Sequence, residues 1–257
     1  MNGILLFQAI IIGIVSYFAS IFTPWALGTT GGYYTLGRPL VAGCIIGLIM
    51  NDLQTGILCG VAVQAVFITN ISTGGSTNSE IVYASYGGIG LALASNATPA
   101  IAVTLSLLVG SLGLMLFSLT MIENSFWGNR FNEAVKENSI SKMWLNHVFL
   151  SQLVQFIIRV LPIVLIIYFG EAFVSEVLEA VPDKVIHIMD VLGGLLPALG
   201  VALLMNLLIK NKAHLIFFLT GVVFINFIAN SMIALAIIAS LVAYLVYRFD
   251  NGAKEDI

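Results

Sequence analysis

Ionisable side chains are almost absent from the first half of this chain, and their absence limits the possible folds more than any other feature. Before Glu123 the only charged residues are Arg38, Asp52 and Glu80. Charged residues make up 9% of the whole chain, against about 25% in a typical soluble domain. So few charges cannot cover a water-facing surface. The sequence therefore predicts an integral membrane protein whose solvent is lipid.

Long apolar segments predict several membrane-spanning helices. A helix needs roughly 20 apolar residues to cross the hydrocarbon core. Four segments meet this requirement: 4–22, 99–122, 147–169 and 188–209. A fifth run, 215–247, is too long for one span and has a polar middle at Asn226, Asn230 and Ser231. It predicts a C-terminal hairpin of two short helices.

Residues 38–96 form a different kind of segment, in which short apolar pieces are interrupted by polar residues. The pieces 39–50 and 55–69 are separated by Asn51-Asp52-Leu53-Gln54, and each is short for a full span. Such interruptions are typical of transporter binding sites. We therefore predict an all-α, polytopic membrane protein with broken or re-entrant helices, organised as a single membrane-embedded domain over 1–257.

The distribution of charge predicts the orientation of the later spans. Residues 123–146 carry Arg130, Lys136 and Lys142, and the positive-inside rule assigns them to a cytoplasmic loop. Residues 170–187 are acidic and have an amphipathic helical pattern, so we expect an external segment there. The alternation of spans then leaves the C-terminus in the cytoplasm.

Ionisable groups within the apolar segments need a reason to be there, since each costs about 2.5–3.5 kcal/mol or more at the bilayer centre. Asp52 lies at the break between two half-helices. It either accepts hydrogen bonds from a polar solute or caps the second half-helix through the N–H groups of residues 54 and 55. Arg159 either pairs with a carboxylate across the bundle or snorkels toward the cytoplasm, and a span beginning at His147 favours snorkelling.

Amide side chains provide further candidates. Gln64 either makes a helix–helix hydrogen bond or contacts a ligand. Asn70 follows on the same apolar run, and the stretch from Ser72 to Glu80, which includes Asn78, is rich in hydroxyls, amides and glycine. That stretch is either an ordinary exposed turn or a ligand-binding loop.

No motif for catalysis, metal binding or cofactor binding is present. The cysteines, Cys44 and Cys59, lie in apolar runs and are predicted to be small core residues. The three histidines lie at segment ends, where interfacial positions are usual. We expect no catalytic residue, no metal site, no cofactor and, at a net charge of −3, no nucleic-acid partner.

The run from Arg38 to Ile71 resembles the membrane subunit IIC of the mannose-type (mannose–fructose–sorbose) sugar phosphotransferase system. That family shows Arg-Pro-Leu, then Gly-Asp-Leu-x-Thr-Gly, then an apolar helix bearing Glu or Gln. The matching elements here are Arg38-Pro39-Leu40, Asn51-Asp52-Leu53-Gln54-Thr55-Gly56 and Gln64. The overall length, the basic middle segment and the final hairpin also match.

The resemblance implies a sugar-translocating subunit of a phosphoenolpyruvate-dependent system in the bacterial inner membrane. Its partners would be a IID membrane subunit and cytoplasmic IIA and IIB phosphocarriers, in an oligomeric complex. It would not itself be an enzyme, because IIA and IIB would transfer the phosphoryl group to a hexose or amino sugar. Carried over, the sugar-binding residues are Asp52, Gln64, Asn70, Asn78 and Glu80, with Arg38, Pro39, Thr55 and Gly56 in supporting roles.

The chain departs from the family pattern at Asn51, Asn70 and Ser79-Glu80. These positions lie where a sugar would be recognised, so the sequence leaves the sugar unassigned. Two other functions are compatible with the residues. One is an ion-coupled secondary transporter with Asp52 and Glu80 as proton or sodium sites, and the other is a non-transporting membrane scaffold.

Overall fold

The protein is described by a computed structural model in which the regular elements of the described residues are all helices. This confirms the predicted all-α fold class. The chain divides into two compact units, Met1–Leu203 and Leu204–Ile257. The structure describes residues 3–26, 28–69, 79–180, 182–209, 215–227 and 231–255.

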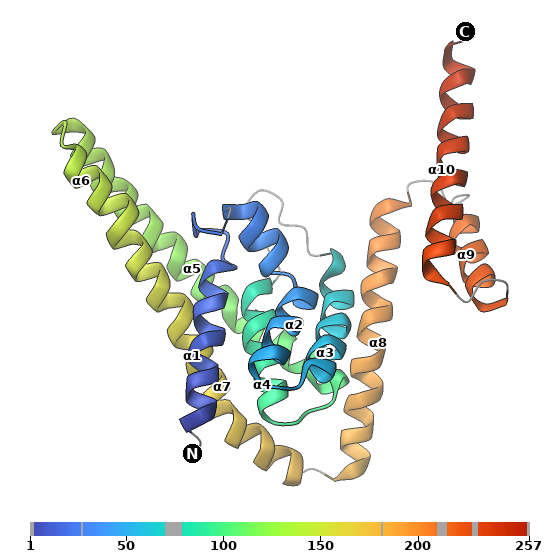
Figure 1. Cartoon of the computed structure of the whole chain (residues 1–257), viewed down its shortest axis with the longest axis horizontal. Coiled ribbons are helices and arrows are strands. Elements are labelled where there is room, and N and C mark those ends of the chain that lie inside the picture. Colours follow the sequence, from blue (N-terminus) through green and yellow to red (C-terminus); the bar gives the residue numbers. More distant parts are fainter. Residues whose placement is uncertain are drawn as a thin grey trace. The chain divides into compact units, whose positions relative to one another are not determined.

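In the described part of the chain, two helical runs are long and apolar enough to cross a membrane, and a bent pair of helices, Thr29–Leu36 with Pro39–Ile49, would be a third if it forms one span. The first is α5 (Pro99–Lys136); the second covers Ile140–Glu176 and contains α6 (Ile140–Trp144), η4 (Leu145–Leu150) and most of α7 (Ser151–Ala180). Helices α5 and α7 contact each other, and α1 lies along α7 (Figure 1). These helices are the frame on which the shorter elements are packed.

Both segments predicted to separate the spans are largely helical and continue from the spanning helices, and their cytoplasmic and external placement stays a prediction. The predicted loop 123–146 is helical through Lys136, because this part contains good helix formers and no proline. The predicted external segment 170–187 is divided between the end of α7 and the start of α8 (Asp183–Leu208). Pro182 directly precedes the first residue of α8.

The stretch predicted to be broken consists of short helices, as expected. A π-helix, η1 (Thr29–Leu36), meets α2 (Pro39–Ile49) at a bend of 75°. A second π-helix, η3 (Tyr83–Gly88), runs directly into α4 (Ile89–Ala94). Proline at the first position of α2 suits a new helix start, because its missing N–H has no helical partner to lose there.

Helix α2 and α3 (Leu53–Val66) form a hairpin with very close backbones. The chain reverses at Asn51, which has a φ of 60°, a left-handed conformation that asparagine tolerates better than most residues. Two GxxxG motifs, Gly43 to Gly47 in α2 and Gly56 to Gly60 in α3, face each other across the hairpin. A Cβ atom placed on Gly56 would lie 2.5 Å from the Gly43 carbonyl oxygen. Only glycine permits this approach.

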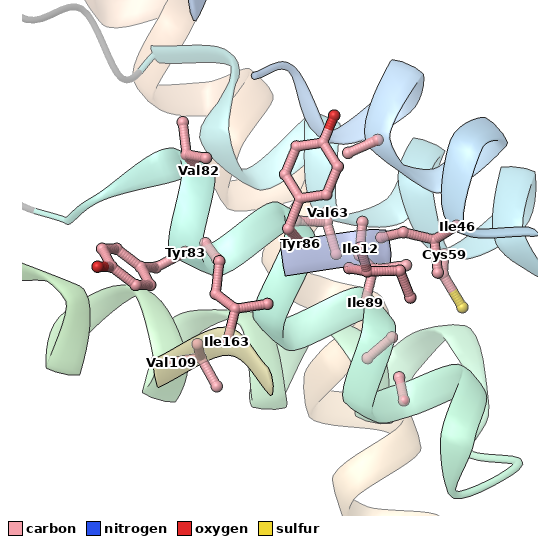
Figure 2. Close-up of a cluster of buried hydrophobic side chains, with 14 of the residues drawn as sticks. Ile12, Ile46, Cys59, Val63, Val82, Tyr83, Tyr86, Ile89, Val109 and Ile163 are labelled. Atoms are coloured by element: carbon pink, nitrogen blue, oxygen red, sulfur yellow. The ribbon is translucent and has the colours of Figure 1, made fainter. Parts of the chain in front are cut away.

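The hydrophobic core of the first unit surrounds η3 and the start of α4. Tyr83, Tyr86 and Ile89 are buried there. They belong to one cluster with side chains from α1 (Gly3–Phe18), α2, α3, α5 and α7 (Figure 2). Cys59 is a buried free thiol in this cluster, as predicted, whereas Cys44 is half-buried. The π-helix is therefore enclosed by protein from several directions.

The second unit contains the C-terminal hairpin predicted from residues 215–247. It consists of α9 (Leu215–Phe227) and α10 (Met232–Glu255), which contact each other (Figure 1). Many of its large apolar side chains are exposed, Phe227 by 83%. An apolar exterior of this kind is suited to a lipid environment.

Replacing Gly56 by alanine should destabilise the protein, because the new Cβ would collide with the Gly43 carbonyl oxygen. Overpacking of this kind costs about 1–3 kcal/mol. Gly128→Ala is the matched control, since a Cβ at Gly128 in α5 meets no atom within 4 Å. Thermal unfolding in detergent should give a lower Tm for Gly56→Ala and an unchanged or higher Tm for Gly128→Ala. Equal Tm values for the two variants would contradict the close α2–α3 contact.

Candidate functional site

Asp52 lies at the turn between α2 and α3 and is exposed. Its Oδ1 accepts a hydrogen bond of 3.1 Å from the Thr55 N–H, so it is the N-cap of α3. This confirms the capping prediction at one of the two expected N–H groups. The contact is local, since Thr55 lies in the first turn of the same helix, and the carboxylate is exposed. Its role in binding a solute stays a prediction.

The supporting residues predicted around Asp52 lie at helix starts and crossings. Arg38 precedes α2, and its guanidinium lies 5.2 Å from the centre of the Tyr34 ring. Pro39 begins α2, Thr55 donates to Asp52, and Gly56 allows the close contact with α2. Each of these residues shapes the hairpin rather than offering a free polar group.

Gln64 lies near the other end of α3. Twelve residues separate it from Asp52, which corresponds to about 18 Å along a helix. The Gln64 Oε1 atom is buried and has no hydrogen-bond partner in the described part of the chain. A buried acceptor without a donor is costly, at about 1–3 kcal/mol. Asn70 and Asn78, the other predicted amide ligands, lie outside the described residues.

Glu80 is buried and fully engaged. Its Oε1 lies 2.9 Å from Nη1 of Arg159, in an ion pair whose side chains are only 5% and 3% exposed. Its Oε2 accepts a 2.7 Å hydrogen bond from the Tyr83 N–H. Glu80 therefore pairs two distant segments and caps the helical turn that leads into η3.

Arg159 does not snorkel, which corrects the interpretation favoured from the sequence. Its Nη2 donates to the Ser20 hydroxyl at 3.1 Å, and its guanidinium lies 4.4 Å from the centre of the Tyr83 ring. Ser20, Glu80, Tyr83 and Arg159 together form what we call the buried polar cluster. A buried charge is tolerated when it is paired and hydrogen-bonded, and Glu80 provides that partner.

The polar face of α7 is turned inward. Gln152 accepts from the Tyr17 hydroxyl at 2.8 Å, and Gln155 donates to Glu123 at 2.6 Å. With Arg159 they lie at spacings of three and four residues, on one face of the helix. Exposed apolar residues occupy other positions on α7: Leu153, Ile157, Leu161 and Leu165. This inverted amphipathic pattern is what a lipid solvent requires.

Side chains of η3 satisfy backbone carbonyls that the neighbouring break leaves without helical partners. The Tyr86 hydroxyl donates to the Leu36 carbonyl at 2.8 Å, and the single Ser85 hydroxyl proton is shared between the Ile81 carbonyl at 2.7 Å and the Gly37 carbonyl at 3.2 Å. The Leu36 and Gly37 carbonyls lie at the end of η1, where the chain bends into α2. Unpaired backbone groups are expensive in lipid, so these hydroxyls stabilise the bend.

Sequence reasoning missed the hydroxyls of Ser20, Tyr83, Ser85 and Tyr86. A usable signal was present, because a Tyr-Ala-Ser-Tyr-Gly-Gly run inside an apolar segment places three donors on one short helix. Buried hydroxyls normally find partners. A second signal was that Glu80 and Arg159 are two ionisable residues in apolar surroundings with opposite charge.

The arrangement presents polar groups that can form hydrogen bonds. Among the described residues, no three His, Cys, Asp or Glu side chains come together as possible metal ligands. Among the predicted site residues that the structure describes, the exposed Asp52 carboxylate and the unpaired Gln64 amide oxygen offer acceptors. Both accept hydrogen bonds from hydroxyls.

Comparison with known proteins gives consistent matches over most of the chain. Residues 6–245 match the family model described as PTS system sorbose-specific IIC component. The mannose-specific EIIC component of the PTS system of Escherichia coli (strain K12) is 21% identical over 220 residues, which is 85% of this chain and 82% of the relative.

Solved membrane-protein structures have the same fold. One, described as "Structure of membrane protein", superposes with a TM-score of 0.78 at 19% identity, covering 96% of each chain. The mannose transporter ManYZ in complex with microcin E492 gives a TM-score of 0.58 at 20% identity, again with 96% of each chain covered.

Breaking the Glu80–Arg159 pair from either side should destabilise the protein strongly. Arg159→Gln or Glu80→Gln leaves a buried charge unpaired, which costs about 3–5 kcal/mol. The double variant should lose less than the sum of the two, because neither charge then remains unpaired. Unfolding in detergent measures all three variants.

The matched control is the exposed pair Glu137–Lys142, which has a shorter separation of 2.6 Å but side chains 55% and 61% exposed. Neutralising either member should change the free energy of unfolding by less than about 1 kcal/mol. Additive losses at Glu80 and Arg159 would show that the two charges are not coupled.

Proposed function

The chain belongs to the family of sorbose-specific IIC components of the sugar phosphotransferase system, and from this membership we propose that it binds a hexose or amino sugar in the membrane and passes it inward for phosphorylation. It is a sugar-translocating integral membrane subunit. The family model is specific for sorbose and the E. coli relative for mannose, so membership by itself does not name the sugar. The residues predicted to contact the sugar region depart from the family pattern at Asn51, Asn70 and Ser79-Glu80.

One observation supports the proposed recognition of a sugar at this end of α3. The buried Gln64 Oε1 lacks a donor in the described part of the chain, and a sugar hydroxyl would supply one. An exchange of this kind favours binding because an unsatisfied buried acceptor is stabilised when its partner arrives. The position also matches the Glu or Gln of the family motif.

The remaining predicted contacts are Asn70, Asn78, Asp52 and Glu80. We propose that Asn70 and Asn78 contribute amide groups. Asp52 lies about 18 Å along α3 from Gln64, too far for one monosaccharide to contact both, so we propose that Asp52 accepts from sugar hydroxyls at a different stage of transport. Glu80 belongs to the same set, but both of its oxygens are engaged by Arg159 and Tyr83. A direct contact between Glu80 and sugar would therefore require one of these partners to be exchanged.

Alternating access requires part of the protein to move relative to the rest. Helix η3 and α4 share one hydrophobic core with α1, α5 and α7. A motion of the broken stretch alone would expose that core to lipid or water. We therefore propose that these helices move together, in an elevator-like or rocking step.

The partners and location follow from the same membership. We propose a IID membrane subunit as the partner within the bilayer, with IIA and IIB phosphocarriers transferring the phosphoryl group on the cytoplasmic side. The protein would lie in the bacterial inner membrane with its C-terminus in the cytoplasm, as the basic residues of 123–146 favour. No phosphoryl-transfer chemistry is assigned to this chain.

Sugar uptake should depend on the complete phosphotransferase pathway. The chain is expressed in bacteria that lack other sugar permeases, with and without a IID subunit and with and without the phosphoryl donor, and uptake of radiolabelled hexoses and amino sugars is measured. Accumulation of sugar phosphate only when all components are present is the expected result. Uptake that persists without them and stops when the ion gradient is collapsed would instead indicate an ion-coupled transporter.

Replacing Gln64 by leucine should raise the KM for sugar uptake about 3–10-fold, the loss expected for one hydrogen bond between neutral groups. Gln64→Glu keeps an acceptor and should retain uptake. Gln54→Leu is the control, since Gln54 is an exposed glutamine on the same helix, and its KM should not change. A normal KM for Gln64→Leu would remove Gln64 from the site.

A further inference from the structure

Pro162 opens the hydrogen-bond ladder of α7 in the middle of the membrane span. Proline has no N–H, so the carbonyl four residues earlier, that of Ile158, loses its helical donor. The Tyr83 hydroxyl donates to that carbonyl at 2.8 Å. A side chain from η3 thus completes the backbone of α7 at the one place where Pro162 interrupts it.

The ring, the hydroxyl and the backbone N–H of Tyr83 each contact a partner near this opening. The Arg159 guanidinium lies over its ring at 4.4 Å, and the Tyr83 N–H donates to Glu80. Glu80 in turn pairs with Arg159. The contacts therefore form a closed loop that starts on α7 with Ile158, crosses η3, and returns to α7 at Arg159.

Helix α5 makes room for this arrangement on the opposite side. A Cβ atom on Gly113 would lie 2.8 Å from the Tyr83 Cβ and 3.0 Å from the Glu80 Cβ. The Glu80 N–H donates to the Gly110 carbonyl at 3.1 Å. Figure 2 shows Tyr83, Val109 and Ile163 grouped where η3 packs between α5 and α7.

We propose that Tyr83 and Arg159 are positioning residues for sugar transport. They dock η3 into the opening at Pro162, and this docking holds the backbone at Glu80 in register with α7. This inference rests on the proposed function. Glu80 is where the polar stretch assigned to sugar recognition rejoins the core. Neither Tyr83 nor Arg159 contacts the sugar in this scheme, and both act through Glu80.

Replacing Pro162 by alanine distinguishes a positioning role of Tyr83 from a purely stabilising one. Tyr83→Phe leaves the Ile158 carbonyl without a donor and should lower the Tm by about 5 °C. Pro162→Ala restores a backbone N–H to that carbonyl, so the Tm loss caused by Tyr83→Phe should largely disappear in the double variant. Tyr86→Phe is the matched control. It removes a buried hydroxyl from the same π-helix whose acceptor is the Leu36 carbonyl, so Pro162→Ala should not relieve its Tm loss.

The second part of the test measures the kinetics of sugar uptake in cells that also contain the IID, IIA and IIB partners. Tyr83→Phe should raise the KM for sugar about 3–10-fold with Vmax within about twofold. In Tyr83→Phe/Pro162→Ala the Tm should recover while the KM stays raised, because η3 still lacks its hydrogen bond to the Ile158 carbonyl of α7. Arg159→Lys, which keeps the charge, should restore uptake in part relative to Arg159→Gln.

A normal KM for Tyr83→Phe, or a KM that recovers together with the Tm in the double variant, would overturn the positioning role. Independent Tm losses for Tyr83→Phe and Pro162→Ala would overturn the docking geometry itself. The Tm measurements on Tyr83→Phe, Pro162→Ala and the double variant require no sugar, so they test the docking even if the wild-type chain takes up none. Absence of wild-type uptake would count against the proposed function, not against the docking.

Discussion

The structure depends on one constraint: a backbone carbonyl released by a break in a membrane helix must find another donor inside the protein. Tyr86 and Ser85 supply donors to Leu36 and Gly37 at the bend before α2. Tyr83 supplies one to Ile158 at the proline of α7. All three donors come from η3, so a single short π-helix stabilises two separate interruptions. Its burial at the centre of the core follows from this role.

The Glu80–Arg159 pair adds specificity to the same element. Buried ion pairs contribute little net stability compared with well-packed apolar residues, but an unmatched member is strongly unfavourable. In this chain the pair permits one docking of η3 on α7, because any other register would leave a charge in the apolar interior. The glycines of α5 at positions 110 and 113 bring the backbones close enough for that docking. Charge pairing and close packing therefore select the same arrangement.

For transport, this arrangement separates groups that hold the fold from groups that remain free for a ligand. Glu80 is held by Arg159 and the Tyr83 N–H, and Arg159 also donates to Ser20. The Gln64 oxygen has no hydrogen-bond partner in the described residues, and the Asp52 carboxylate is exposed. A sugar with several hydroxyls complements such acceptors. Replacing Glu80 or Arg159 is therefore expected to lower the free energy of unfolding, whereas replacing Gln64 is expected to raise the KM for sugar uptake.

Composition and the order of segments were sufficient to establish the membrane class, the broken stretch 38–96, the C-terminal hairpin and the family, since these depend on local hydropathy and short motifs. They did not locate the ends of α5 and α7, which continue past the predicted boundaries because charged helix formers extend a helix beyond the apolar part. Nor did they show that Arg159 pairs with Glu80 or that Tyr83 completes the helix at Pro162. These partners are some 80 residues apart in sequence, and which hydroxyl reaches which carbonyl is decided only when the packed helices bring them together. Local patterns reveal that a donor or a charge needs a partner, and tertiary packing selects the partner.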